Sequence, residues 1–342
     1  MKPSEAHPTQ GHETRVMPLL TIGIPTYNRG LKLDRLLGQI AEQSEKLASF
    51  PRLQVLVSNN CSTDGTRDFL DKFKAESFDL RVIHQPVNIG ACRNFERLHR
   101  ESVTDYTWIF SDDDILFSGA IERVLRVIME QRPDVLRFSF VQPTGSSVRQ
   151  FAYGDRIYLT NNKPEIVRII SVYRKISSYV VKNIYIPPDD PIFHYAGGYG
   201  WGWLGWNYAV LHRLANPRVA VISEALASCD EDETGTDWTR FGFTVWSEHP
   251  RTFLHPFVLE HAPELFKEHD AGMYRAWVFC YDLCQRGVLS QAYFSNAQVV
   301  KPPVRLRLLL TDWRLCWCLI RARIGKPWIY TMQDFVKKVV PW

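Results

Sequence analysis

The chain has 342 residues, 45% of them hydrophobic and 23% charged, and its formal net charge is +4 at pH 7. These values exclude a mostly disordered or fibrous protein and predict about two globular domains, or one enlarged domain, with a sizeable core. The small net charge argues against a nucleic-acid partner. The unusual value is the aromatic content of 13%, which includes 11 tryptophans.

Residues 1–17 are polar and lack the apolar segment of a signal peptide, so we expect a disordered tail there. No later run approaches the roughly 18–20 apolar residues that span a bilayer. The seven cysteines do not form the paired Cys-x2-Cys knuckles of a zinc site. We interpret them as reduced thiols and expect a cytoplasmic protein, with peripheral attachment to the inner face of the cytoplasmic membrane as an open alternative.

Short apolar runs alternate with amphipathic segments through the first 140 residues. This rhythm is typical of strands and helices that form a mainly parallel sheet covered by helices on both faces. The expected strands are 19–25, 53–58, 80–84, 107–110 and 135–140, and the expected helices are 31–40, 66–73, 91–100 and 120–130. Ligands bind beyond the carboxyl ends of such strands, where the polar clusters of this chain lie.

The rhythm is less regular after residue 150. We expect strands at 153–159, 180–186 and 219–222, helices at 164–173 and 207–214, a long loop at 187–206 and an acidic loop at 230–237. From residue 248 onward the pattern is helical.

The first strand end carries Pro25, Thr26, Tyr27, Asn28 and Arg29. Threonine and asparagine can hydrogen-bond a polar ligand, the tyrosine ring can stack on a base, and the arginine can reach a phosphate. The alternative is an ordinary loop that caps a helix.

The next two strand ends are also polar. Asn59 and Asn60 lie in the turn after the second strand, and Arg93 lies one turn into the helix after the third. An arginine at that place suits a diphosphate, whereas helix capping and a surface arginine are the alternatives.

Three consecutive carboxylates, Asp112, Asp113 and Asp114, follow the fourth strand. Adjacent carboxylates repel one another, and a hard divalent cation relieves that repulsion because it prefers oxygen ligands. The alternative is an exposed acidic turn. Four such clusters in order, at four successive strand ends, favour a binding site.

The four motifs together resemble the family 2 glycosyltransferases with the GT-A fold. They are Pro25-Thr-Tyr-Asn-Arg, Val57-Ser-Asn-Asn-Cys-Ser-Thr-Asp-Gly-Thr, Asn88-x-Gly-x-x-Arg-Asn and Ser111-Asp-Asp-Asp. The resemblance covers about residues 18–140. It implies an inverting enzyme of the bacterial surface-polysaccharide type, which binds a nucleotide-diphosphate sugar and Mg²⁺ or Mn²⁺.

The resemblance also implies roles for single residues. Pro25, Thr26, Tyr27, Asn28 and Arg29 would serve the donor, with the first four lining the nucleoside pocket. Asn59 and Asn60 would meet the base, and Arg93 would lie near the nucleotide. Asp112 and Asp114 would be the ends of an Asp-x-Asp motif, facing the ribose or donor sugar and the metal respectively, with Asp113 on the donor side and Asp112 as a second metal contact.

Two departures from the family pattern stand out. Asn59 and Asn60 occupy a turn in which the family usually has aspartate, so the base preference is open. The Gly/Trp-rich segment 197–207 lacks the carboxylate that often serves as catalytic base there. We nominate one of Asp230, Glu231 or Asp232 as the base, against the alternative that they form a solvated acidic loop.

The tryptophans of that segment, Trp201, Trp203 and Trp206, could stack on an acceptor glycan, or they could be core residues or a hydrophobic lid. The tail 301–342 holds nine basic and two acidic residues, a formal charge of +7, together with four tryptophans. Basic residues beside tryptophan suit an anionic membrane surface, while packing on the catalytic domain is the alternative.

We therefore expect a GT-A catalytic domain at 18–240, with donor binding at 18–140 and an acceptor side at 141–240, followed by a helical region with a basic, Trp-rich tail at 241–342. The expected activity is metal-dependent, inverting transfer of a sugar to a glycan, plausibly lipid-linked. A sugar nucleotidyltransferase is an alternative, although residues 23–28 are not the Gly-rich loop it needs. A non-catalytic nucleotide-sugar or glycan binding protein that has lost its base is the other.

Overall fold

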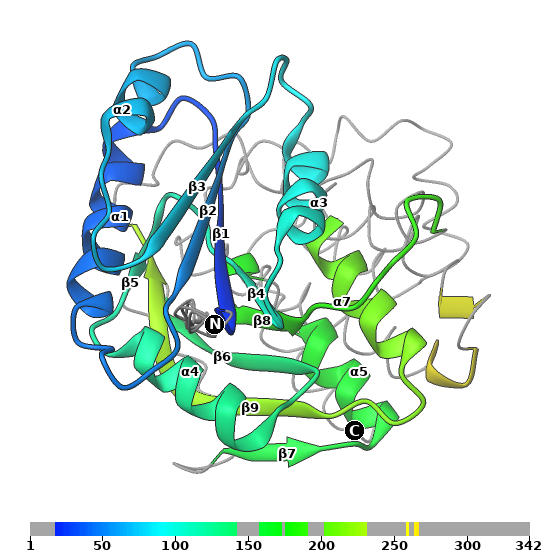
Figure 1. Cartoon of the computed structure of the whole chain (residues 1–342). Coiled ribbons are helices and arrows are strands. Elements are labelled where there is room, and N and C mark those ends of the chain that lie inside the picture. Colours follow the sequence, from blue (N-terminus) through cyan, green and yellow to red (C-terminus); the bar gives the residue numbers. More distant parts are fainter. Residues whose placement is uncertain are drawn as a thin grey trace, which may run out of the picture.

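The computed structural model describes residues 18–141, 157–172, 175–190, 202–230, 258–259 and 263–266. These residues form one nine-stranded sheet with helices on both faces (Figure 1). The strand order is β3-β2-β1-β4-β8-β6-β9-β5, and β7 pairs with β9. The predicted tail 1–17, Trp201, Glu231, Asp232 and nearly all of the predicted helical region 241–342 lie outside the described residues.

The strands run as follows: β1 Leu20–Thr26, β2 Gln54–Asn59, β3 Asp79–His84, β4 Tyr106–Ile109, β5 Asp114–Leu116, β6 Val135–Val141, β7 Tyr158–Thr160, β8 Tyr179–Lys182 and β9 Val219–Cys229. The α-helices are α1 Gly30–Ser44, α2 Thr66–Lys72, α3 Ala91–Glu101, α4 Ala120–Gln131, α5 Lys163–Val172 and α7 Gly202–Arg213. Two short 3₁₀ helices are η1 Ile176–Ser178 and η4 Pro263–Leu265.

The first half of the sheet is parallel, as the alternating pattern predicts. β1 pairs in parallel with β2 and β4, and β2 pairs in parallel with β3. The register places Thr26 opposite Asn59, and Asn59 opposite His84. The carboxyl ends of these strands therefore meet at one edge, which confirms the predicted α/β fold class for this half.

The second half is mixed. β8 is antiparallel to both β4 and β6, and β9 is antiparallel to β5 and β7 but parallel to β6. The sequence did not indicate this, because β5 and β8 span only three and four residues. β9 also outruns the predicted strand 219–222, since Ser223 and Glu224 interrupt its apolar run beside a register shift against β6.

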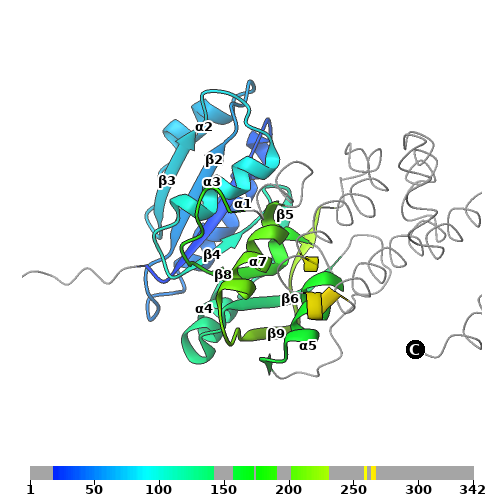
Figure 2. The same ribbon diagram turned by 90° about the vertical axis from the view of Figure 1, so that its right-hand side faces the viewer.

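The helices bury leucine-rich faces on both sides of the sheet. Leu33, Leu36 and Leu37 of α1 enter the main core together with α4, whereas α3 packs over β1 and β2 on the opposite face and also contacts α7. Figure 2 shows α3 and α7 in front of the strands. α3 can approach β1 closely because position 23 is glycine: a Cβ there would lie 3.4 Å from Leu98 Cβ of α3 and 2.9 Å from Ile109 Cδ1 of β4.

Helix α7 begins inside the segment that the sequence predicts as a loop. Its buried residues Trp206, Ala209 and Val210 supply an apolar surface that outweighs the low helix propensity of its two glycines. Among the described residues, no helix has the length and apolar character needed to cross a membrane.

Candidate functional site

The loops that follow β1 and β2 are tied together by Asn28. Its backbone is left-handed, with φ of 53°, which asparagine tolerates better than most residues. The backbone N–H of Asn28 donates to Ser62 Oγ at 2.9 Å, and the N–H of Thr63 donates to Asn28 Oδ1 at 2.7 Å. Asn28 therefore shapes the predicted nucleoside pocket, and its side-chain oxygen already serves the neighbouring loop.

Asn59 and Asn60 are both buried, and both use their side chains to hold the loop ends. Asn59 Nδ2 lies 3.1 Å from His84 Nδ1, and His84 Nε2 lies 3.1 Å from Asp71 Oδ1. Asn60 Nδ2 donates to Asn88 Oδ1 at 2.9 Å. These amides form a fixed wall at the end of β2, where the resemblance implies contact with a base.

Three further donor-side predictions fall on exposed or partly exposed positions. The Tyr27 side chain is 44% exposed, Arg93 is exposed in the first turn of α3, and Pro25 is partly buried at the end of β1. An exposed aromatic ring and an exposed cation at one sheet edge are free to meet a planar base and a phosphate.

The three consecutive aspartates lie in and after the turn between β4 and β5. Asp112, Asp113 and Asp114 are 2%, 5% and 3% exposed. Their burial excludes the alternative of an exposed acidic turn. Because carboxylates are expensive to bury, each must be stabilised by a nearby partner.

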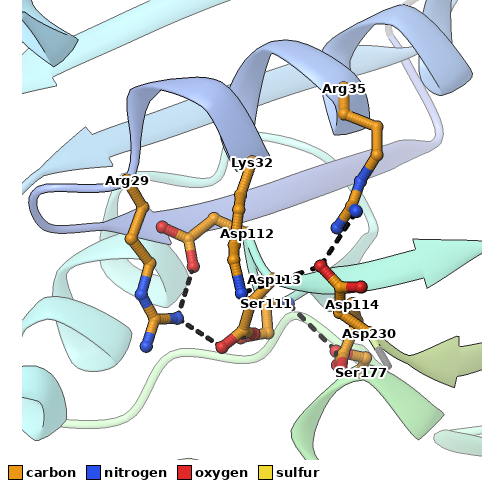
Figure 3. A network of polar contacts seen from close by, with 9 residues as sticks. All are labelled: Arg29, Lys32, Arg35, Ser111, Asp112, Asp113, Asp114, Ser177 and Asp230. Carbon is orange, nitrogen blue, oxygen red and sulfur yellow. Dashed lines mark hydrogen bonds and ion pairs between the residues drawn. The ribbon is translucent and has the colours of Figure 1, made fainter. Parts of the chain in front are cut away.

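Arg29 supplies that partner for two of them. Its Nη1 donates to Asp112 Oδ1 at 3.0 Å and also to Asp113 Oδ2, and the Ser111 hydroxyl donates to Asp113 as well. Figure 3 shows the guanidinium reaching from the start of α1 to this pair of carboxylates. The sequence predicts that Arg29 serves the donor, whereas in this structure its partners are aspartates.

One oxygen of Asp112 is left over. Oδ2 is buried and, by distance and angle, makes no hydrogen bond within the part of the chain that the structure describes. The Thr26 hydroxyl, which is also buried without a hydrogen bond of full geometry, lies close enough to lower the pKa of Asp112. Burial raises the pKa of Asp112 to about 6, although the Arg29 charge opposes the shift. A buried carboxylate oxygen without a partner requires an explanation, and a ligand cation or hydroxyl would satisfy it.

Asp114 is held from the second half of the sheet. The Ser177 hydroxyl, in η1, donates to Asp114 Oδ2 and accepts from the Ser111 N–H at 2.9 Å. Burial raises the pKa of Asp114 to about 7, with the Lys175 charge opposing the shift. Sequence analysis missed Ser177, because a serine ahead of an apolar strand carries no distinctive signal.

Asp230 lies beside these aspartates because β5 and β9 pair with Asp114 opposite Cys229. Its carboxylate is 2.9 Å from Arg35 Nη1 and 3.7 Å from Lys32 Nζ. Arg29, Lys32 and Arg35 thus reach from one face of α1 towards the acidic residues (Figure 3). Their spacing of three residues was visible in the sequence and would have indicated this face.

Trp206 is a core residue. It is 3% exposed, stacks on His99 with ring centroids 4.4 Å apart, and lies 5.7 Å below the Arg100 guanidinium carbon. The burial and stacking of Trp206 favour the alternative that it is a core residue over the prediction that it binds an acceptor. Trp201 lies outside the described residues, and the structure describes the Trp203 backbone in α7 but not its side chain.

The aspartates fit a divalent cation that receives part of its ligands from a bound phosphate. Within the described ranges, no three Asp, Glu, His or Cys side chains form a group ready to hold a metal. Mg²⁺, however, is commonly bound by one or two carboxylates together with substrate phosphates and water. The unpaired oxygen of Asp112 fits a cation that arrives with a phosphate ligand.

Comparison with known proteins finds relatives that are named as glycosyltransferases. The abequosyltransferase RfbV of Salmonella typhimurium is 31% identical over 119 residues, which are 34% of this chain and 34% of that protein. The GalNAc(5)-diNAcBac-PP-undecaprenol β-1,3-glucosyltransferase of Campylobacter jejuni is 23% identical over 137 residues, 40% of this chain and 43% of that protein. The chain thus spans about a third to less than half of these curated relatives.

The fold is shared with a solved structure. The crystal structure of S. aureus TarS 1–349 in complex with UDP-GlcNAc aligns with a TM-score of 0.56 at 16% identity, covering 81% of this chain and 79% of that one. Residues 21–180 match the family model described as glycosyl transferase family 2. Together with the GT-A-type sheet, that match identifies residues 21–180 of this chain as a glycosyltransferase family 2 domain.

Proposed function

We propose that the protein transfers a sugar, with inversion, from a nucleotide-diphosphate donor to a glycan acceptor in the synthesis of a bacterial surface polysaccharide. The observation that carries the proposal is the buried Asp112, whose Oδ2 makes no hydrogen bond of full geometry among the described residues. It lies at the end of β4 within the family 2 domain, beside the polar ends of β1 and β2. Ligands of open α/β sheets bind at this edge.

On the donor side, the Tyr27 ring would stack on the base and Arg93 would contact the diphosphate. Pro25, Thr26 and Asn28 would line the nucleoside pocket, with Asn59 and Asn60 as its rigid wall. The interactions that fix Asn28, Asn59 and Asn60 support this, because a pocket that is ordered before binding loses less entropy when the ligand arrives.

Asp112 would hold Mg²⁺ or Mn²⁺ through its unpaired oxygen, and Asp114 would complete the pair of carboxylates once it exchanges its Ser177 contact. The cation supplies neutralisation of the charge that develops on the departing diphosphate. The residues of the chain fix the leaving group in place and exclude water from it.

On the acceptor side, a carboxylate among Asp230, Glu231 and Asp232 would remove the proton from the attacking hydroxyl. The Asp230 carboxylate is engaged by two cations, Lys32 and Arg35, both of α1. These ion pairs favour a structural role for Asp230, and Glu231 or Asp232 would then be the base. The name of the C. jejuni relative includes an undecaprenol-linked saccharide, which supports a lipid-linked acceptor here.

We also propose that the catalytic domain spans 18–240, with a helical region at 241–342, and that the protein works in the cytoplasm. The basic tail 301–342 would rest on the anionic inner face of the cytoplasmic membrane, where a lipid-linked acceptor is found.

The proposal is tested with a panel of nucleotide sugars, with and without Mn²⁺, by thermal shift and by donor hydrolysis. We expect one donor to raise the melting temperature and to be hydrolysed slowly, with Mn²⁺ increasing both effects. If no nucleotide sugar stabilises or is consumed by the protein, the proposed function is wrong. Binding without any hydrolysis or transfer would favour the non-catalytic alternative instead.

A further inference from the structure

Arg29, which directly precedes α1, is predicted to serve the donor but is bound to two aspartates. A single nitrogen, Arg29 Nη1, serves both Asp112 and Asp113. The Arg29 side chain is 31% exposed, whereas the two aspartate side chains are 3% and 8% exposed. The arginine can therefore swing towards solvent, while the two carboxylates stay where the β4–β5 turn fixes them.

The charges explain what this contact does before any ligand binds. Arg29 neutralises one of the two negative charges of Asp112 and Asp113, and it holds one oxygen of the carboxylate whose other oxygen is unpaired. A divalent cation at that free oxygen would share the carboxylate with a guanidinium, and the two positive charges repel each other. The described residues also lack a three-ligand group that would compensate for this repulsion.

We propose that Arg29 couples metal binding to nucleotide binding by exchanging partners. In the free protein it bridges Asp112 and Asp113, and in the loaded protein it turns to the diphosphate and leaves Asp112 to the metal. A diphosphate makes the exchange favourable because it offers the guanidinium a bidentate acceptor and offers the metal further oxygen ligands. This inference rests on the proposed function, and Arg29 acts in it as a positioning residue.

The coupling has a reciprocal form. If the nucleotide tightens metal binding by a given factor, the metal must tighten nucleotide binding by the same factor. The protein would then bind free Mg²⁺ or Mn²⁺ weakly and would bind the metal tightly only together with the donor.

The first test uses the unmodified protein. Free Mn²⁺ is followed by electron paramagnetic resonance, alone and with saturating UDP, CDP, GDP or dTDP in turn. For the nucleotide that binds, we expect the Mn²⁺ dissociation constant to fall by about tenfold or more, in the range usual for coupled sites. An unchanged Mn²⁺ dissociation constant overturns the inference.

The second test compares Arg29→Gln with Arg126→Gln. Both variants lose one positive charge, but Arg126 lies on α4, where it pairs with Glu122 away from the site. We expect Arg29→Gln to bind Mn²⁺ alone about tenfold more tightly and to lose most of the coupling, and Arg126→Gln to match the parent. Arg29→Lys keeps the charge and should keep weak binding of free Mn²⁺.

The outcomes separate the two proposals. If none of the four nucleotides binds, the proposed function fails. If a nucleotide binds and sugar is transferred, but Arg29→Gln binds free Mn²⁺ as weakly as the parent, only the role of Arg29 is refuted. Should Arg29→Gln not fold, the experiment on the parent protein can still overturn the inference, because an unchanged Mn²⁺ dissociation constant requires no variant.

Discussion

The two halves of the sheet build the site in different ways. In the parallel half, β3-β2-β1-β4, each strand ends in a polar loop, and the chain delivers the residues of one loop in one stretch. In the mixed half, β8-β6-β9-β5, Ser177 comes from a segment that has no motif of its own, and Asp230 comes from an acidic run whose neighbours the sequence does not indicate. Local motifs thus mark the first half, whereas only the strand pairing reveals the second.

Besides the pairing of β4 with β8, two side-chain contacts between the halves are places where the comparison can be tested. On one face of the sheet, Trp206 of α7 stacks on His99 of α3. At the strand ends, Ser177 of η1 bonds to Asp114 and to the Ser111 N–H.

The largest effect is expected at the first junction. Trp206→Ala should lower the free energy of unfolding by about 3–5 kcal/mol, because it empties a buried site between the two helices. Urea unfolding measures the loss. Trp206→Phe, which keeps an aromatic face on His99, should lose much less, and equal losses in both variants would contradict a stacking role.

The next effect concerns the aspartate with the unpaired oxygen. Asp112→Asn should reduce transfer or donor hydrolysis about 100-fold or more and abolish the Mn²⁺-dependent thermal shift, since it removes a charge that the cation needs. Activity assays on the identified donor give the measurement. Asp68→Asn, on the exposed face of α2, serves as the control. Retained Mn²⁺ dependence in Asp112→Asn would show that the cation binds elsewhere.

At the second junction we expect a smaller loss of stability, which should depend on one hydrogen bond. Ser177→Ala removes the hydroxyl that donates to the buried Asp114, so the free energy of unfolding should fall by about 1.5–3 kcal/mol, the range for hydrogen bonds to charged groups. Ser178→Ala is the matched control, because its hydroxyl donates only to the Lys175 carbonyl. If the two variants lose the same amount, the bond between Ser177 and Asp114 is not special.

The smallest effect is a pH dependence. Burial lowers the pKa of His99 from 6.5 to about 3, with the Arg100 charge adding to the shift. Below pH 6.5 the unfolded chain therefore binds a proton that the folded chain refuses, and stability falls as the pH falls towards 3. The parent should lose about 1.4 kcal/mol more than His99→Gln between pH 7.5 and 5.5. Urea unfolding at each pH gives the free energies. If the parent and His99→Gln lose the same stability between pH 7.5 and 5.5, His99 is charged in the folded state.

The four polar strand ends could be predicted from the sequence, because parallel strands carry their loops in chain order. The hydrogen-bond partners of the residues in those loops could not be predicted. Asn28 and Asn59 fit the pattern of ligand-binding residues, yet their amides are occupied by Ser62, Thr63 and His84, and no single loop contains all of these partners.

The remaining differences have the same physical origin. β5 is too short to leave an alternating pattern, so the turn around Asp114 could not be recognised as a strand start. Trp206 was ambiguous because a tryptophan that stacks on sugar and one that fills a core have the same local sequence. Burial decides between them, and burial depends on the packing of α3 against α7.

The chain of contacts from Asp71 through His84 to Asn59 bears on how this protein can change over evolutionary time. Each of the three side chains satisfies the next, so replacing any one of them alone leaves a neighbour without its partner. A return to the aspartate that the family usually has at position 59 would remove the amide donor, so the His84 ring would have to offer an N–H group to each of its two neighbours. Positions 59, 84 and 71 therefore constrain one another, and a substitution at one changes the hydrogen bonds that the next must make.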